Sequence, residues 1–516
     1  MLYNIIPKNR LLTLITRIKM KKSLYIAFAL TLVLASCSEG IEYGKTVTIS
    51  EDVLMDKIRG GWFAQTIGCT YGGPTEFKYK GGLIPDAQPM IWYDNYIYDT
   101  FIADPGLFDD VYMDLTFLEV MCDMGIDAPV EEYANRFANA DYYLWHANQA
   151  ARYNILNGRP APESGYWKYN PHADDIDFQI EADFIGMLCP GQPVKAAALA
   201  DRIGHIMNYG DGWYGGVFVS ALYAYAYVCD DIPTIVREAA KMIPEGTRFR
   251  RCVDDVLRLW KKYPNDWKQC WFELEKLYSH EIGCPEGVWN CFNIEAVTNS
   301  AYVLIGLLYG EGDFEKTMEI STRCGQDSDC NPASAAGVLG VIYGYEAIPE
   351  KYRKGAEMIA DLPFPFTSLS LNEVCLKNLE LMGVQDGQLS FTVEAPQPVR
   401  WEQSFEGLKP VAKTVLKKRF SDSLTLEFDG NSVVVEGSVV KTGHDESDYT
   451  ARLRAYLDGE LVEEWLMPVD YVTRKYELFS RYCFGSGHHT LRFEWLNPHP
   501  DYVINAQTML VYDNEN

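Results

Sequence analysis

The sequence predicts a fold in two parts, an all-helical domain followed by a C-terminal β-sandwich. Residues 50–385 carry helical patterns rich in Ala, Leu, Tyr and Met, broken by turn signals such as Pro190-Gly191. After Gly387 the pattern changes to short segments in which apolar and polar residues alternate, which is typical of strands. With 516 residues the chain is long enough for more than one core.

The N-terminus predicts export. Basic residues precede a short apolar run, 24–35, which leads into Leu-Ala-Ser-Cys at Cys37. This ending resembles the lipobox of bacterial lipoproteins, whose cysteine becomes the lipidated first residue. We therefore expect a lipoprotein signal peptide at 1–37, with 1–19 an over-extended start, and a tether at 38–49. The chain would be an exported bacterial lipoprotein, anchored to a membrane only through Cys37, in the periplasm or at the cell surface.

The helical region contains small residues at helical spacing, as in Gly60, Ala64 and Gly68. Small residues on one face let two helices pack backbone to backbone. The segment 213–229 has no charged residue and is almost long enough to mimic a membrane span. It is bounded by acids and interrupted by Ser220, so we interpret it as a buried central helix.

The last part of the chain predicts an accessory β-sandwich, of the galactose-binding-like kind, at 411–516, after a linker at 386–410. Turn pairs such as Asp458-Gly459 separate its segments. The expected strands are Leu424–Phe428, Ser432–Val440, Ala451–Leu457 and Thr490–Trp495.

Composition limits the partners. The formal net charge is −26 and the pI about 4.7, which argues against nucleic acid and anionic membrane surfaces. The thirteen cysteines are scattered without a CxxC spacing, so the sequence shows no usual zinc motif. We expect mostly buried free thiols.

Two acidic clusters predict one metal site. Asp327 and Asp329 sit in a turn ahead of a helix of small residues, where Asn331 is expected as the cap. Asp109 and Asp110 open a second helical pattern far away in the sequence. Carboxylates held at rigid helix starts suit a hard cation, so we expect Mg²⁺.

A third acidic stretch, 174–183, supplies candidates for chemistry. Its interleaved apolar residues indicate partial burial, and buried acids need a metal, a cation or a hydrogen-bonding substrate; a solvated acidic face is the alternative. We take Asp175 and Asp177 as candidates to orient a substrate or activate water. Candidate substrate-binding residues are Asn148, Asn293 and Gln179, with packing or capping as the alternative for Asn293.

Several motifs carry a family resemblance. A glycine helix runs from Asp56-Lys57-Ile58-Arg59-Gly60 to Gly68, and Gly212-Trp213-Tyr214-Gly215-Gly216 opens a central helix. The metal motifs are Phe108-Asp109-Asp110-Val111 and Gly325-Gln326-Asp327-Ser328-Asp329-Cys330-Asn331-Pro332. Over about residues 50–350 the chain resembles the ADP-ribosylglycohydrolases, which include the dinitrogenase reductase-activating glycohydrolase. The resemblance implies an all-helical fold and metal ligation by Asp109, Asp110, Asp327 and Asp329.

The chain departs from the family at two metal-binding hydroxyl positions, which are Phe108 and Cys330 here. Phe108 has no ligand atom, and a thiol matches Mg²⁺ poorly. The site therefore holds one divalent cation or two, Mn²⁺ and Ca²⁺ being alternatives to Mg²⁺. Asp114 is a candidate replacement ligand, because it lies four residues after Asp110 on the same helix face.

The resemblance implies hydrolysis of an N- or O-glycosidic bond to ribose, and export favours a ribosyl or other furanosyl substrate. The partner is then a sugar-containing small molecule or a glycan, with Asp110, Asp175 and Asp177 as the catalytic candidates. Two alternatives stay open: an ADP-ribosyl-protein hydrolase, and a non-catalytic glycan-binding lipoprotein.

Overall fold

The computed structural model describes residues 40–279, 283–403, 405 and 407–514. The expected signal peptide, the lipid anchor at Cys37 and the first two residues of the tether lie outside the described residues. Residues 43–516 form one compact unit, which contains both the helices and the strands. In the described part of the chain, no helix has the length and apolarity needed to cross a bilayer.

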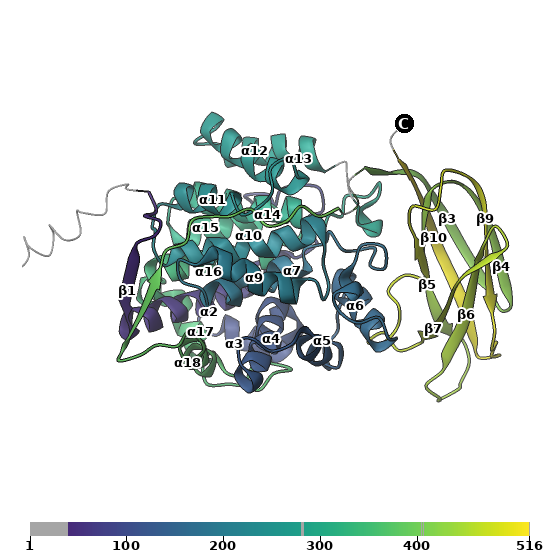
Figure 1. Cartoon of the computed structure of the whole chain (residues 1–516), viewed down its shortest axis with the longest axis horizontal. Helices are drawn as coiled ribbons and strands as arrows, with labels where there is room; N and C mark the ends of the chain where they lie inside the picture. Colours follow the sequence, from purple (N-terminus) through teal and green to yellow (C-terminus); the bar gives the residue numbers. More distant parts are fainter. Residues whose placement is uncertain (1–39, 280–282, 404, 406, 515–516) are drawn as a thin grey trace, which may run out of the picture. The chain divides into compact units, whose positions relative to one another are not determined.

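The region from residue 51 to 382 is helical (Figure 1). A two-stranded antiparallel sheet of β1 (Thr46–Ser50) and β2 (Gln388–Thr392) joins its two ends. Its α-helices are α2 (Glu51–Gly72), α3 (Tyr96–Ala103), α4 (Asp109–Met124), α5 (Val130–Ala138), α6 (His146–Leu156), α7 (Asp177–Ile180), α8 (Asp183–Met187), α9 (Pro193–Gly204), α10 (Gly210–Ala226), α11 (Ile232–Ala240), α12 (Arg248–Lys262), α13 (Trp267–Tyr278), α14 (Ala296–Gly310), α15 (Phe314–Arg323), α16 (Cys330–Tyr343), α17 (Glu350–Glu357) and α18 (Leu371–Met382).

The core of this region consists of helices that are buried on every side. All residues of α10 and α14 are buried, and so is nearly all of α16. A helix that is apolar all round must be surrounded by protein. The buried central helix expected at 213–229 is α10, which begins at Gly210 and ends at Ala226.

Helices α2 and α16 touch through their backbones. A Cβ atom added at Gly60 would lie 2.0 Å from the carbonyl oxygen of Gly340, and one at Gly68 would lie 2.5 Å from the Cα atom of Ala333. Further along, a Cβ atom at Gly72 would lie 1.9 Å from the carbonyl oxygen of Ser328, in the acidic turn. This packing therefore fixes the acidic turn against the end of α2.

Replacing Gly60 by alanine is expected to lower the free energy of unfolding by about 3 kcal/mol, because neither backbone has room to move away. Urea unfolding followed by circular dichroism measures the change. Gly82→Ala is the matched control, since an added Cβ atom there meets nothing within 4 Å. Equal stability of the two variants would contradict backbone contact between α2 and α16.

Eight strands form a sandwich of two antiparallel four-stranded sheets, with strand orders β3-β10-β5-β8 and β4-β9-β6-β7. Residues that alternate along the strands point inward and form its core; Trp495 is 2% exposed there. The architecture of helices followed by a β-sandwich confirms the predicted fold class. The strands are β3 (Leu408–Phe420), β4 (Ser423–Gly430), β5 (Ser432–Lys441), β6 (Thr450–Leu457), β7 (Glu460–Pro468), β8 (Phe479–Arg481), β9 (Gly487–Trp495) and β10 (Tyr502–Asn514).

The sandwich is hydrogen-bonded to α6. The Tyr153 hydroxyl donates to the backbone carbonyl oxygen of Leu466 at 2.8 Å. The Gln149 side-chain amide donates to the backbone carbonyl oxygens of Tyr471, at 2.9 Å, and Arg474, at 2.7 Å. These contacts hold the loop between β7 and β8 against the helical region. Tyr476 of that loop lines the candidate site, and Glu477 contacts the buried His172 next to it.

Candidate metal and active site

The two predicted acidic clusters meet at the N-terminal ends of α4 and α16. Donor atoms of Asp109, Asp110 and Cys330 lie within 4.8 Å of one another, and so do those of Asp327, Asp329 and Cys330. The Cys330 thiol lies 3.9 Å from Asp109 Oδ1. Cys330 therefore belongs to both groups, and the four carboxylates surround one centre.

The local structure explains this meeting. After α2 ends, the chain runs beside the acidic turn. The Phe77 N–H donates to the Gln326 carbonyl oxygen at 3.0 Å, and the Gln326 N–H donates to the Tyr79 carbonyl oxygen at 3.1 Å. The hydroxyl groups of Thr75 and Ser328 are 2.9 Å apart. This pairing also brings Glu76 to the centre.

The helix start itself differs from the prediction. Asn331 was expected as the cap, but α16 begins at Cys330, with Asp329 before it. Asn331 lies in the first turn and donates its side-chain amide to Asn299 Oδ1 at 2.9 Å. The cap prediction is wrong because this amide is used to join α16 to α14.

The carboxylates are buried and incompletely hydrogen-bonded. Asp110, Asp327 and Asp329 are at most 3% exposed. Each has one Oδ1 atom that is buried without a hydrogen-bond partner. Buried carboxylate oxygens without donors are costly unless a cation balances them. Free oxygen atoms converging from several carboxylates are the ligand set that a hard divalent cation requires.

Burial and mutual repulsion raise the pKa values of these groups. Desolvation is the main cause for Asp109, Asp110 and Asp329, whose pKa values lie well above the ordinary range. Neighbouring carboxylates add to the shift, Glu76 being the largest such contributor for Asp109 and Asp329. Burial raises the pKa of Glu76 itself to about 8. A bound cation favours the ionised forms and reverses these shifts.

The centre opens into a cavity of about 750 Å³. Its acidic lining residues are Glu76, Asp104, Asp109, Asp177, Glu181, Glu286, Asp327 and Asp329. Its aromatic lining residues are Phe77, Tyr112, Tyr143, Trp145, Phe292, Phe366 and Tyr476. Among the described lining residues, Lys80 is the single lysine or arginine. The cavity therefore combines a strongly acidic floor with apolar rings, an arrangement that suits a cation and a polar ring-shaped ligand.

Two further carboxyl groups face this cavity from the third acidic stretch. The Asn148 N–H donates to Asp177 Oδ1 at 2.9 Å, and the Asn148 side-chain amide donates to Glu181. Asp177 Oδ2 and Glu181 Oε2 have no hydrogen-bond partner. Burial raises the pKa of Asp177 to about 6 and that of Glu181 well above its ordinary value. The two carboxyl groups thus differ in proton affinity within one cavity.

A model of the ADP-ribosylglycohydrolase family matches residues 50–377. The chain belongs to the ADP-ribosylglycohydrolase family. Membership implies hydrolase activity on glycosidic bonds. The match spans the helical region from β1 to α18 and contains both metal motifs.

Solved structures give more distant likenesses. An ADP-ribosylglycohydrolase-related protein complex is 15% identical, with a TM-score of 0.43, over 64% of this chain and 98% of that one. A family GH115 4-O-methyl-α-glucuronidase with specificity for decorated arabinogalactans is 14% identical, with a TM-score of 0.18, over 62% of this chain and 42% of that one. No curated protein matches the sequence.

The departures from the family pattern have structural explanations. Phe108 is fully buried, with its ring centroid 5.8 Å from those of Phe101 and Phe364, so it packs behind the centre. Asp114 receives the Gln65 side-chain amide at 3.2 Å and the Phe184 N–H at 3.3 Å, and it does not line the cavity. The metal ligands that the structure offers are therefore carboxylates, together with the Cys330 thiol.

Three other predicted site residues lie behind the cavity wall. Asp175 accepts from His172 Nδ1 at 2.7 Å, and Gln179 Oε1 accepts from the Ser300 hydroxyl at 2.5 Å. Asn293 precedes α14, and its side-chain amide donates to Thr298 Oγ1 at 3.1 Å. Asn148, by contrast, lines the cavity.

Sequence reasoning missed Glu76, Glu181 and the aromatic lining. Glu181 belongs to the acidic stretch that was singled out, so helical spacing from Asp177 was an available signal. The sequence around Glu76 carried no such signal, because Glu76 reaches the metal centre through loop pairing with residues about 250 positions away.

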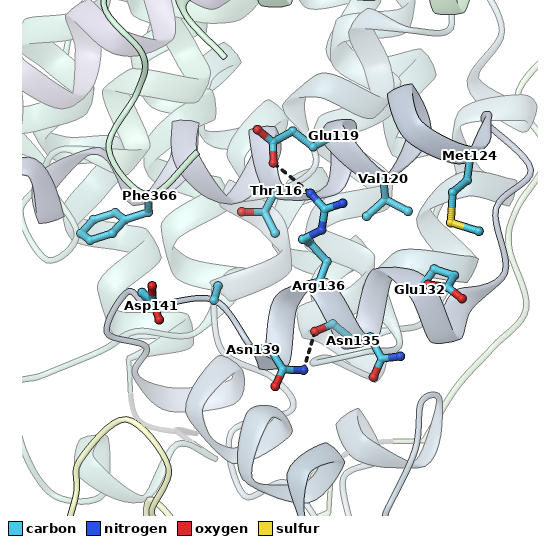
Figure 2. A pocket seen from close by; sticks show the side chains of 11 residues that line it. Thr116, Glu119, Val120, Met124, Glu132, Asn135, Arg136, Asn139, Asp141 and Phe366 are labelled. Carbon is cyan, nitrogen blue, oxygen red and sulfur yellow. Dashed lines mark hydrogen bonds and ion pairs between the residues drawn. The ribbon is translucent and has the colours of Figure 1, made fainter. Parts of the chain in front are cut away.

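A second hollow, of about 520 Å³, lies between α4 and α5 (Figure 2). Its arginine is paired: Arg136 contacts Glu119 at 3.1 Å and Asp123 at 2.6 Å. The Asn139 side-chain amide donates to the Asn135 carbonyl at 2.9 Å, as drawn in Figure 2. Among its described lining residues, this hollow lacks the cluster of buried carboxylates that the acidic cavity contains.

Proposed function

We propose that this chain is an exported, divalent-metal-dependent hydrolase of an N- or O-glycosidic bond to ribose or another furanose. The observation that carries the proposal is the convergence of Asp109, Asp110, Asp327 and Asp329, grouped around Cys330. Asp109, Asp327 and Asp329 line the floor of the acidic cavity, Asp110 lies behind it, and Asp110, Asp327 and Asp329 each keep one unpartnered oxygen. These residues would hold Mg²⁺ or a similar cation. When bound, such a cation polarises substrate oxygens and lowers the pKa of water.

Two carboxyl side chains, Glu181 and Asp177, carry out the two proton transfers of the reaction. Burial holds the pKa of Glu181 well above its ordinary value, which favours the protonated form, so we assign Glu181 as the general acid toward the leaving group. Asp177, with a pKa of about 6, is largely ionised and accepts a proton from the attacking water. Its Oδ1 is held by the Asn148 N–H, which leaves Oδ2 for this step. Two carboxyl groups with separated pKa values are typical of acid–base pairs.

The lining favours a neutral sugar. A diphosphate would enter a cavity with eight acidic side chains and one lysine among its described lining residues. Tyr143 and Trp145 are 57% and 42% exposed at its edge, where their rings can stack on a sugar face. The signal peptide predicted at 1–37 is a second reason, because ADP-ribosylated proteins are mainly intracellular. Family membership favours the second candidate, removal of ADP-ribose from a protein.

A substrate panel tests the proposal. It contains neutral furanosides, nucleosides and ADP-ribosylated peptides, each assayed with Mg²⁺ and with chelator. We expect release of free sugar from a neutral furanosyl compound, lost on chelation and restored by Mg²⁺. Turnover of ADP-ribosylated peptides alone would favour the second candidate. Binding of sugars without any turnover would identify a glycan-binding protein, and turnover unaffected by chelator would refute the metal requirement.

A further inference from the structure

A second group of donor atoms lies at the wall of the acidic cavity, which one of its members, His146, itself lines. It consists of His146 at the start of α6, His172 and Asp175 in the turn before α7, and Cys284 in the loop before α14. One donor atom from each lies within 4.8 Å of the others. Three of these side chains are at most 1% exposed and that of His146 is 13% exposed. Three distant segments therefore bring two imidazoles, a carboxylate and a thiol together.

The distances suit a tetrahedral ion. Cys284 Sγ is 3.7 Å from His172 Nδ1, and His146 Nδ1 is 3.7 Å from Asp175 Oδ2. Bonds of 2.0–2.3 Å at tetrahedral angles place two donors about 3.3–3.8 Å apart. His172 Nδ1 and Asp175 Oδ2 are closer, at 2.7 Å, so this hydrogen bond must open by about 0.6 Å to admit an ion.

The surroundings orient the central imidazole for coordination. His172 Nε2 contacts the Glu477 carboxylate of the β7–β8 loop. Asp175 contacts the other ring nitrogen, Nδ1, so the imidazole is held between two carboxylates. Once the Nδ1 proton has left, a carboxylate that accepts from Nε2–H fixes the tautomer in which Nδ1 is the ligand. Glu477 therefore leaves Nδ1 of His172 to face Cys284 and Asp175.

Hydrogen bonding alone does not satisfy the group. His146 Nδ1 and Asp175 Oδ1 are buried without a hydrogen-bond partner. His146 has a positive φ of 45°, a backbone conformation that is costly for a non-glycine residue and that concentrates at functional sites.

We propose that His146, His172, Asp175 and Cys284 bind one zinc ion at a site separate from the acidic centre. Imidazole and thiolate ligands prefer Zn²⁺, whereas the carboxylates of the acidic centre prefer Mg²⁺. Two neutral imidazoles, one carboxylate and one thiolate balance the two charges of the ion. Binding releases the thiol proton of Cys284 and the proton that His172 carries between its two carboxylates.

This zinc ion has a positioning role. Four protein ligands leave no open position, which is typical of structural zinc. The ion would tie the start of α6 to the turn before α7, and these segments carry Asn148 and Asp177 of the cavity. The proposal does not depend on glycoside hydrolysis, because zinc content is measured without substrate.

Elemental analysis of the purified full-length protein, dialysed against a weak chelator, tests the proposal. We expect about one zinc ion per chain in the wild type and at least about tenfold less in Cys284→Ser and in His172→Gln. Cys330→Ser is the matched control, because its thiol lies in the acidic centre; it should keep its zinc. Replacing zinc by Co²⁺ should give thiolate-to-cobalt absorption that Cys284→Ser loses and Cys330→Ser keeps. Glu477→Gln should weaken zinc binding about 10–100-fold.

Two results would overturn the site. One is a folded wild-type protein that takes up no zinc from a micromolar zinc solution; the other is a zinc content that Cys284→Ser and His172→Gln leave unchanged. Copper or nickel retained in place of zinc would overturn the choice of ion. Circular dichroism of each variant identifies misfolding; if both variants misfold, zinc content and cobalt absorption of the wild type decide the outcome.

Discussion

Replacing Asp329 by asparagine is expected to lower kcat/KM by about 100-fold or more, equivalent to about 2.7 kcal/mol of transition-state stabilisation. Asp329 is buried at the start of α16, and its unpartnered oxygen faces the other acids. An amide removes one negative ligand and with it most of the affinity for a divalent cation. The measurements are Mg²⁺ titration by calorimetry and turnover of the best substrate of the panel.

The same substitution should not weaken the fold. Neutralising one of several repelling carboxylates removes a desolvation cost, so metal-free Asp329→Asn should melt at or above the wild-type temperature. Asp127→Asn is the matched control, since that side chain is 92% exposed and should change neither property. Full turnover by Asp329→Asn would show that the acidic centre is not the source of activity.

The metal-free protein is expected to lose stability as pH rises from 5 to 8. The pKa values of Asp109, Asp110, Asp329 and Glu181 are well above their ordinary values in the folded state, and that of Glu76 is about 8. In this window the folded chain holds more protons than the unfolded chain, whose carboxyl groups titrate near pH 4. Each extra proton lowers the free energy of unfolding by about 1.4 kcal/mol per pH unit. The stabilisation is complete below about pH 4 and disappears above the folded-state pKa values.

Divalent cations should reverse this trend, because they replace the protons that the carboxylates release. Saturating Mg²⁺ should raise the melting temperature more at pH 8 than at pH 5. Thermal melts at both pH values, with chelator and with Mg²⁺, make the comparison, and Asp329→Asn should respond less than Asp127→Asn. An equal Mg²⁺ effect at both pH values would contradict cation binding by these carboxyl groups.

Much of the fold could be predicted because its signals are local. The glycine spacing around Gly60 and Gly68 predicted close helix packing, and the change of pattern after Gly387 predicted the strands. β2 was not foreseen, since a five-residue strand at 388–392 pairs with β1 more than 300 residues earlier. Such pairing depends on where the fold brings the chain ends and leaves no mark in a short segment.

The site was predictable where the ligands sit on helix starts. Asp109 and Asp327 could be assigned because each follows or precedes a recognisable helical pattern. Side-chain direction could not be assigned in 174–183, where Asp177 faces the cavity and Asp175 faces His172. Alternation and helical spacing both fitted this stretch, and only the short helix α7 decides between them. Tyr476 was also unpredictable as part of the site, because it arrives from the sandwich.

The backbone contact between α2 and α16 separates two kinds of evolutionary constraint. The glycines in this contact pack against α16 and the acidic turn, and they tolerate almost no added side-chain volume. The cavity walls come from other segments, as Tyr143, Phe292 and Phe366 illustrate. Selection for a new sugar can therefore reshape the walls while the frame that carries the carboxylates stays the same. One catalytic floor can in this way serve a range of substrates across related chains.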